Sequence, residues 1–249
     1  FVKFYNTSKS LFVKNKGFQA LEKISLKLYK GETLGLIGES GSGKTSLSNA
    51  ILKIHKFEEG EIFFNGLDIS KIQGKELLGF RKNIQIVFQD PYASLNPLHN
   101  IYQIISEPLI FHKICGKEDL YDECKKLIND VGLSENFLNS YPHELSGGQR
   151  QRVCIARAIS VKPQVLICDE SVSALDVSIQ ATVLNLLNQL KQKYNFTYIF
   201  ISHDLSVVRH MSDKILVLHS GKIVEYNDAD LLFKKPMDSY TKKLINASL

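Results

Sequence analysis

The residues best suited to chemistry in this 249-residue chain form a glycine-rich loop that fits the pattern G-x-x-x-x-G-K-[ST]. The loop consists of Gly38, Glu39, Ser40, Gly41, Ser42, Gly43, Lys44 and Thr45. Glycines allow the backbone to fold so tightly that successive N–H groups point into one concavity, where they hold phosphate oxygens. Lys44 can reach the outer phosphates of a nucleotide, and the Thr45 hydroxyl can ligate Mg²⁺. The pattern therefore predicts a nucleotide-binding site.

The segments on either side of the loop are those that a phosphate-binding loop requires. Residues 33–37 are largely apolar and predict a buried strand before the loop. After the loop, Leu47, Ala50, Ile51 and Ile54 recur at helical spacing. The positive N-terminal end of such a helix adds to the attraction for phosphate. This context favours phosphate binding over the alternative, a Gly/Ser-rich surface loop.

Two carboxylates follow a second apolar segment. Residues 165–168 are apolar, as expected for a central parallel strand, and Asp169 and Glu170 come directly after them. In a phosphate-loop fold the first acid orients the Mg²⁺ shell and the second can polarise the attacking water. Two acids that end a strand are also common in plain turns. The phosphate loop upstream favours the catalytic interpretation.

A second anion site is indicated just before a basic helical pattern that starts at Arg150. Its residues are Ser146, Gly147, Gly148 and Gln149, which combine a hydroxyl, two small residues and a helix N-terminus. The alternative is an ordinary serine N-cap with a flexible glycine pair. Because one chain rarely needs two phosphate-binding helix starts, we expect this one to serve a nucleotide held by another subunit.

The first part of the chain predicts strands. Apolar and polar residues alternate over 24–29, which is typical of an antiparallel strand with one wet face. Asn65-Gly66 between residues 61–64 and 67–69 predicts a hairpin, and residues 84–88 predict a buried strand.

A helical insertion follows, with helices expected at about 101–112, 118–131 and 148–160. The α/β pattern then resumes with a helix whose apolar face contains residues 179, 183, 186, 187 and 190, strands at 198–202 and 215–218, and a hairpin at 220–221. We therefore predict one α/β domain over residues 1–249. Its core would consist of residues 1–89 and 161–249, with an N-terminal antiparallel β subdomain, and its inserted α-helical subdomain would span about 90–160.

Composition narrows the possible partners. The net charge is +5, but the basic residues are scattered over the whole length, which favours a solvated surface, or weak attraction to an acidic membrane face, over a nucleic-acid partner. The four cysteines form no C-x-x-C pair, as expected for small buried side chains in a reducing compartment. No apolar run approaches the roughly 18 residues that span a bilayer, so any membrane role is expected to come through a partner.

Together these motifs resemble the ATP-binding subunit of an ABC transporter, over essentially the whole chain. The resemblance implies a P-loop NTPase fold with a RecA-like core, and ATP and Mg²⁺ as cofactors. It assigns Lys44 to the phosphates, Thr45 to Mg²⁺ and Ser46 to the α-phosphate, as in the Walker A motif. Gln89 is similar to the Q-loop glutamine, which contacts Mg²⁺ and the water.

Further roles come from the same resemblance. Asp169 and Glu170 match Walker B, with Asp169 on Mg²⁺ and Glu170 as the catalytic base. Residues 146–149 resemble the signature motif, which contacts the γ-phosphate of the opposing subunit, and Asp176 lies in the D-loop at the subunit contact. His203 matches the switch histidine, although a histidine at a strand end is by itself more often structural.

The family also places an aromatic ring under the adenine, for which Phe12 fits best and Tyr5 is second. Residues 89–97, 141–144 and 239–244 resemble the importers of oligopeptides, dipeptides and nickel.

This implies an ATP-hydrolysing subunit of a peptide importer at the cytoplasmic face of the cell membrane. Its expected partners are a second ATPase subunit, identical or different and arranged head to tail, the transmembrane permease, and indirectly an extracellular or periplasmic binding protein. A nickel or metal-chelate importer, an exporter cassette, and an ABC ATPase of DNA repair or translation stay open as alternatives.

Overall fold

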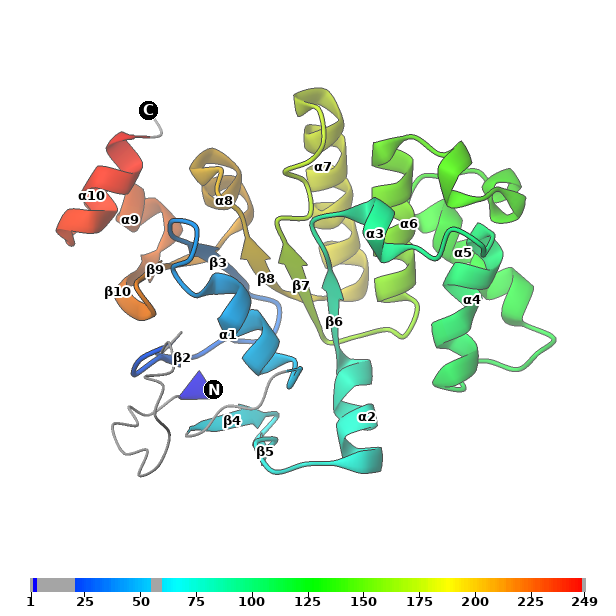
Figure 1. The fold of residues 1–249 in the computed structure, drawn as a ribbon, viewed down its shortest axis with the longest axis horizontal. Helices are drawn as coiled ribbons and strands as arrows, with labels where there is room; N and C mark the ends of the chain where they lie inside the picture. Colours follow the sequence, from blue (N-terminus) through cyan, green and yellow to red (C-terminus); the bar gives the residue numbers. More distant parts are fainter. Residues whose placement is uncertain (1, 4–20, 55–59, 248–249) are drawn as a thin grey trace, which may run out of the picture. The chain divides into compact units, whose positions relative to one another are not determined.

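The computed structural model describes residues 2–3, 21–54 and 60–247 (Figure 1). The chain divides into two compact units, one made of Phe1–Arg81 and Ile199–Leu249 and the other of Lys82–Tyr198. Strand β8 (Thr197–Ile201) carries the chain from the second unit back into the first. Phe12 and Tyr5, the predicted adenine-stacking residues, lie outside the described residues.

The first unit contains a four-stranded sheet in the order β2-β1-β4-β5. Its strands are β1 (Val2–Lys3), β2 (Ser25–Leu26), β4 (Glu61–Phe64) and β5 (Leu67–Asp68), and their pairings are antiparallel. Ile24 and Leu26 are buried whereas Ser25 and Lys27 are exposed, so the predicted antiparallel strand with one wet face is confirmed, but it covers only Ser25–Leu26 of the expected residues 24–29. The predicted hairpin is also confirmed, since Asn65 and Gly66 turn the chain with φ of 50° and 81°.

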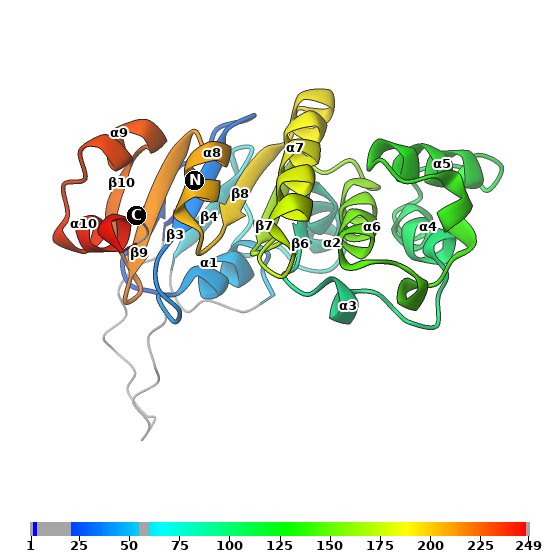
Figure 2. The same cartoon turned by 90° about the horizontal axis from the view of Figure 1, so that it is seen from above.

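A second group of strands in this unit carries the phosphate loop. Strand β3 (Thr33–Ile37), buried along its whole length, runs parallel to β9 (Lys214–His219), and β10 (Lys222–Asp228) pairs antiparallel with β9. Helix α8 (Leu205–Met211) packs against β3. Figure 2 shows α9 (Ala229–Lys234) and α10 (Ser239–Asn246) beside β10.

Two helices of this part of the chain differ from expectation. Helix α1 (Lys44–Ile51) buries Leu47, Ala50 and Ile51 as predicted, but it ends before Ile54, which is 50% exposed. The prediction for Ile54 was wrong because the chain leaves the helix at Leu52 and Lys53, where Lys53 has φ of 52°. Helix α2 (Gly74–Asn83) was not predicted. Of its ten residues, all of them described, only Phe80 is buried, so it has no apolar stripe.

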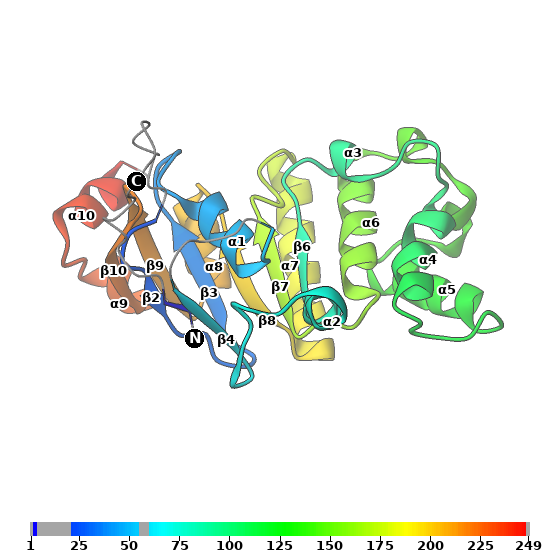
Figure 3. The same ribbon diagram turned by 60° about the horizontal axis from the view of Figure 1, so that its bottom comes forward.

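The second unit contains β6 (Ile84–Val87) and β7 (Val165–Asp169), which are parallel and in the register Ile84 to Val165. Its helices are α3 (Pro91–Ser94), α4 (Ile101–Phe111), α5 (Leu120–Asp130), α6 (Gly147–Ile159) and α7 (Val177–Tyr194), with short 3₁₀ helices at Glu135–Asn139 and Pro142–Glu144. The predicted helices are therefore confirmed to within about two residues. Figure 3 shows α4, α5 and α6 as one group.

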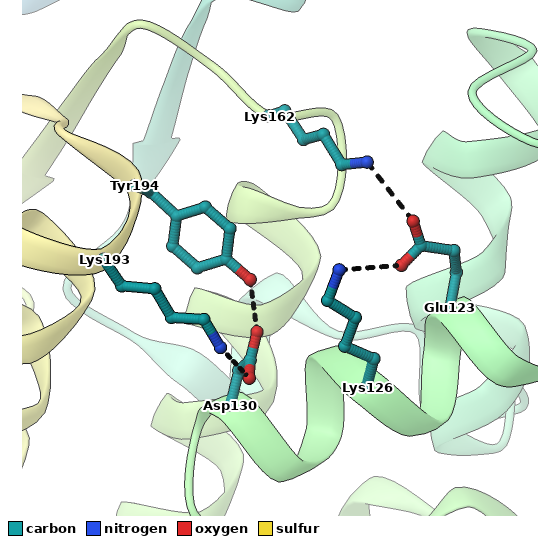
Figure 4. Close-up of polar contacts among 6 residues, drawn as sticks. All are labelled: Glu123, Lys126, Asp130, Lys162, Lys193 and Tyr194. Atoms are coloured by element: carbon teal, nitrogen blue, oxygen red, sulfur yellow. Dashed lines mark hydrogen bonds and ion pairs between the residues drawn. The ribbon is translucent and has the colours of Figure 1, made fainter.

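Polar contacts connect α5 to the end of α7 and to the turn after α6 (Figure 4). Asp130 accepts hydrogen bonds from Lys193 Nζ, at 2.5 Å, and from the Tyr194 hydroxyl. Glu123 forms ion pairs with Lys162, at 3.2 Å, and with Lys126, at 3.9 Å. The lysines of these ion pairs are exposed, so such pairs contribute about 0–1 kcal/mol each to stability.

All four cysteines lie in the described part of the chain as free thiols. Cys124, Cys154 and Cys168 are buried, and burial raises the pKa of Cys124 and Cys168 to about 12 and that of Cys154 to about 11. Within residues 2–3, 21–54 and 60–247, no helix has the length and apolar content needed to cross a membrane.

Candidate nucleotide site

The phosphate loop connects the end of β3 to the start of α1 in the first unit. Its glycines, Gly38, Gly41 and Gly43, have φ of 152°, 79° and 107°, a region that residues with a side chain rarely adopt. At Gly38 the space is closed as well, because a Cβ would lie 2.1 Å from the carbonyl oxygen of Leu218. The Leu218 carbonyl, near the end of β9, therefore leaves room only for glycine at position 38.

Lys44 is only 8% exposed, and its ammonium group lies against the loop's own backbone. The Lys44 Nζ donates to the carbonyl oxygens of Gly38 and Glu39 at 2.7 and 2.9 Å. The Glu39 carbonyl also accepts from the Ser42 N–H at 3.1 Å. Lys44 thus bridges two backbone carbonyls of the loop and places its ammonium group there.

The donors in this loop fit an anionic group. The first N–H groups of α1 have no carbonyl within the helix to bond, and Gly43 at the N-cap has no side chain that could accept from them. The Ser42 hydroxyl is buried, and among the described residues it has no hydrogen-bond partner. The exposed Ser40 and Thr45 and the half-buried Ser46 carry further hydroxyl groups. Backbone donors, the lysine and an orphan hydroxyl are the groups that bind phosphate oxygens.

The loop is also hydrogen-bonded to two segments far along the chain. The Gly221 N–H, in the turn between β9 and β10, donates to the Ser42 carbonyl at 2.9 Å. The Glu39 N–H donates to the Tyr240 hydroxyl, on α10, at 3.0 Å. Neither contact was predicted.

His203, in the same unit, is exposed and lies two residues beyond the end of β8. The next residue, Asp204, caps α8 by accepting from the N–H groups of Ser206 and Val207. Burial acts to raise the pKa of Asp204, but these bonds, the Ser206 hydroxyl and the charge of His203 outweigh it, and the net pKa is lowered. An ionised carboxylate therefore lies next to the histidine.

In the second unit, Glu170 follows β7 with a strained backbone, since its φ is 48°. The Glu170 carbonyl accepts from the Ser173 N–H at 3.1 Å and from the Ser173 hydroxyl at 2.9 Å. The Gln89 Nε2 in turn donates to the Ser173 hydroxyl at 3.4 Å. The structure therefore brings Gln89 and the turn after Asp169 together through Ser173, the first residue of the predicted D-loop segment 173–176.

Ser146 to Gln149 form a capping box at the start of α6. The Ser146 hydroxyl accepts from the Gln149 N–H at 3.3 Å, and the Gln149 Oε1 accepts from the Ser146 N–H at 2.8 Å. The N-cap interpretation of Ser146 thus describes the isolated chain, in which Ser146 and Gly147 at the start of α6 are exposed.

The two glycines of this motif let α6 approach the start of α7. A Cβ on Gly147 would lie 3.7 Å from Leu175 Cδ2, whereas one on Gly148 would lie 2.5 Å from Ile179 Cγ2. Asp176 lies between these two contacts and is the N-cap of α7. The predicted signature and D-loop segments are therefore neighbours within this unit.

The segment after Gln89 is fastened to α6. Asp90 caps α3 by accepting from the Tyr92 N–H at 2.8 Å. Arg157 donates to the Ser94 carbonyl at 2.5 Å, and the Arg150 guanidinium lies 5.2 Å from the centre of the Tyr92 ring. These two contacts attach α3 to α6, the helix that begins with the predicted signature motif.

Comparison with known proteins identifies the family of the chain. Residues 21–173 match the model of the family described as "ABC transporter". The chain is 49% identical over 238 residues to the oligopeptide transport ATP-binding protein OppF of Streptococcus mutans serotype c, covering 94% of this chain and 77% of that protein. It is 45% identical to the oligopeptide transport ATP-binding protein AppF of Bacillus subtilis, covering 98% and 75%.

Among solved structures, the chain resembles the ATP-binding cassette MJ0796 in a dimeric post-hydrolysis state bound to ADP and Pi. The TM-score is 0.79 at 30% identity, with 92% of this chain and 99% of that chain covered. The predicted α/β phosphate-loop fold is thereby confirmed. By sequence, motif and fold, the chain belongs to the ABC transporter family.

Proposed function

We propose that this chain is the ATP-hydrolysing subunit of a membrane importer for oligopeptides or dipeptides. The observation that carries the proposal is the phosphate loop, in which Lys44 is held by the carbonyls of Gly38 and Glu39. The buried Ser42 hydroxyl of the same loop has no hydrogen-bond partner in the described part of the chain. Membership of the ABC transporter family supports ATP as the nucleotide. The oligopeptide transport proteins among its relatives support peptides as the cargo of the complex.

In this proposal the loop backbone and Lys44 bind the β- and γ-phosphates, and Ser46 binds the α-phosphate. The first-turn N–H groups of α1 add the positive end of the helix dipole. An aromatic side chain, Phe12 or in its place Tyr5, is proposed to stack on the adenine.

Thr45, Gln89 and Asp169 are proposed as the Mg²⁺ ligands, since hydroxyl, amide and carboxylate oxygens suit this hard cation. Bound there, Mg²⁺ would neutralise charge on the phosphate oxygens.

Glu170 is proposed as the general base that orients and deprotonates the attacking water, and His203 as the residue that holds the γ-phosphate. The positive φ of Glu170 supports this role, because strained backbone at a strand end often occurs at functional sites. The bonds of Ser173 to the Glu170 carbonyl and to Gln89 would keep the base and the Q-loop aligned.

A second ATPase subunit, identical or different, is proposed to complete each site head to tail. Residues 146–149 would contribute the N-terminus of α6 to the partner's ATP, and Asp176 would lie at the subunit contact. Tyr92, which is 59% exposed on α3, and the segment to Pro97 would contact the permease at the cytoplasmic face of the membrane. A separate binding protein would deliver the cargo.

Phosphate release from Mg-ATP by the purified chain tests the catalytic assignment. Glu170→Gln is expected to lower the rate of ATP hydrolysis by at least about a hundredfold, and the variant should still bind ATP. Glu118→Gln, a change at an exposed carboxylate, is the matched control and should hydrolyse ATP at the wild-type rate. Size-exclusion profiles with ATP should show Glu170→Gln as a dimer. A Glu170→Gln variant as active as wild type would disprove the assignment.

The cargo is tested separately, in cells that lack the chromosomal gene. Uptake of labelled di- to pentapeptides should depend on the restored chain and fail with Glu170→Gln. Restored nickel uptake without peptide uptake would instead assign the chain to a metal importer.

A further inference from the structure

The C-terminal helix α10 reaches the phosphate loop through one side chain, Tyr240. Its hydroxyl accepts a hydrogen bond from the Glu39 N–H at 3.0 Å, across a separation of 201 residues in the sequence. Its ring lies against the ring of His219, at the end of β9, with centroids 3.9 Å apart. Tyr240 lies beyond residues 21–173, which the family model matches, and the proposed ATPase chemistry gives it no role.

The bonded N–H belongs to the peptide group that joins Gly38 to Glu39. The carbonyl of that same peptide group accepts from Lys44 Nζ at 2.7 Å. The two ends of one peptide plane are therefore held by two side chains, Tyr240 at the nitrogen and Lys44 at the oxygen. Because a peptide group is rigid and planar, fixing the N–H also fixes the direction of the carbonyl.

Glycine at position 38 makes this restraint important. Gly38 has φ of 152° and no Cβ, so its backbone has little intrinsic preference for the orientation that the loop needs. A rotation of the Gly38–Glu39 peptide would carry its carbonyl away from Lys44. The lysine would then lose one of the two acceptors that position its ammonium group.

Tyr240 is itself held by a buried anchor. Glu225, 8% exposed, accepts through its two carboxylate oxygens from the N–H groups of Met237 and Asp238, each at 3.0 Å. Asp238 caps α10 by accepting from the Tyr240 N–H at 2.7 Å. Thr241, the residue after Tyr240, is fully buried. The start of α10 is thus fixed to β10, and the hydroxyl is presented to the loop from a rigid support.

We propose that Tyr240 is a positioning residue of the phosphate loop, which orients the Gly38–Glu39 peptide and through it the ammonium group of Lys44 for the outer phosphates of the nucleotide. The inference rests on the proposed ATP binding and deepens it. It makes α10 part of the nucleotide site although Tyr240 need not touch the nucleotide.

The test compares Tyr240→Phe with Tyr226→Phe. The first change removes the hydroxyl and keeps the ring that lies on His219. The second change is the matched control. It removes a tyrosine hydroxyl of the same unit, which donates to the Lys27 carbonyl at 3.1 Å. Dissociation constants for ATP and ADP are measured by displacement of a fluorescent nucleotide, and the thermal midpoint of each nucleotide-free variant is recorded.

Tyr240→Phe is expected to weaken ATP and ADP binding equally, by about three- to tenfold, the value of one hydrogen bond. Its thermal midpoint should stay close to that of wild type, and Tyr226→Phe should bind as wild type does. Unchanged nucleotide affinity in Tyr240→Phe would overturn the inference. A loss of affinity matched by an equal loss in Tyr226→Phe, or by a large fall in thermal midpoint, would also overturn it in favour of a merely structural role.

Hydrogen exchange of the Glu39 amide in the nucleotide-free protein separates this inference from the proposed function. Exchange should be several-fold faster in Tyr240→Phe and unchanged in Tyr226→Phe, roughly in proportion to the lost bond. Equal exchange in all three proteins would show that the contact does not exist in solution. If wild type binds no ATP, the proposed function fails, and the nucleotide role of Tyr240 is overturned with it, whatever the exchange shows.

Discussion

Replacing Gly148 with alanine should destabilise the second unit, whereas the same change at the neighbouring Gly147 should not. Both glycines lie in the first turn of α6. A Cβ at Gly148 would lie 2.5 Å from Ile179 Cγ2, far inside the 3.4–4 Å of ordinary contact, and one at Gly147 would lie 3.7 Å from Leu175 Cδ2. Ile179 has little freedom to move away, because a β-branched side chain in a helix strongly prefers one χ1 rotamer.

The size of the effect follows from two terms. Alanine is favoured over glycine within a helix by about 0.5–1 kcal/mol, and this gain applies to both variants. Overpacking costs about 1–3 kcal/mol and applies to Gly148→Ala alone. The difference in free energy of unfolding between the two variants should therefore be about 1–3 kcal/mol, with Gly147→Ala the more stable.

Urea unfolding of both variants, followed by circular dichroism, measures this difference. Ile179→Ala, combined with each variant, removes the methyl group that would clash, and the difference should then fall below about 0.5 kcal/mol. Equal stability of the two single variants, or a difference that persists without the Ile179 side chain, would refute the packing argument.

Three further predictions concern the thiols, α10 and the loop. Unfolded thiols ionise near pH 8.5, whereas the raised pKa values of Cys124, Cys154 and Cys168 keep them protonated in the fold. As the pH rises, the thiols of the unfolded state therefore lose their protons first, which stabilises the unfolded state. The free energy of unfolding should fall by up to about 1.4 kcal/mol per thiol for each pH unit above pH 8.5. Urea titrations at pH 7.5 and 9.5 measure this fall. Glu225→Gln, which replaces one of two bonded acceptors with a donor, should cost about 1–3 kcal/mol in the same assay. Gly38→Ala should weaken ATP binding by about tenfold or more in a displacement assay. The added Cβ would lie 2.1 Å from the Leu218 carbonyl oxygen, so the loop would have to shift. An unfolding free energy that does not change with pH would contradict the first prediction. Wild-type stability of Glu225→Gln would contradict the second, and wild-type ATP affinity of Gly38→Ala the third.

The sequence was sufficient for the features that depend on local pattern. The apolar run 33–37 before the glycine-rich loop, the Asn65-Gly66 turn and the predicted helices α4 to α7 were confirmed, because each has a strong periodicity or turn signal of its own. Where that signal was absent the prediction failed. Helix α2, which was missed, buries only Phe80 among its ten described residues. Ile54 is the opposite case, because its helical spacing was present but the backbone leaves the helix before it.

The assignment of chemistry to residues also came from the sequence, since the spacing of glycines, lysine and acids is itself the motif. The motif did not reveal what holds these residues in place. Ser173 joins Gln89 to Glu170, Leu218 closes the space at Gly38, and Tyr240 bonds the loop from the opposite end of the chain. Such contacts join residues that are distant in sequence, and no local pattern encodes their pairing. The sequence by itself determined the fold class and the proposed nucleotide chemistry. Only the tertiary structure decided which distant side chains orient the loop, because that choice depends on where separate strands and helices meet.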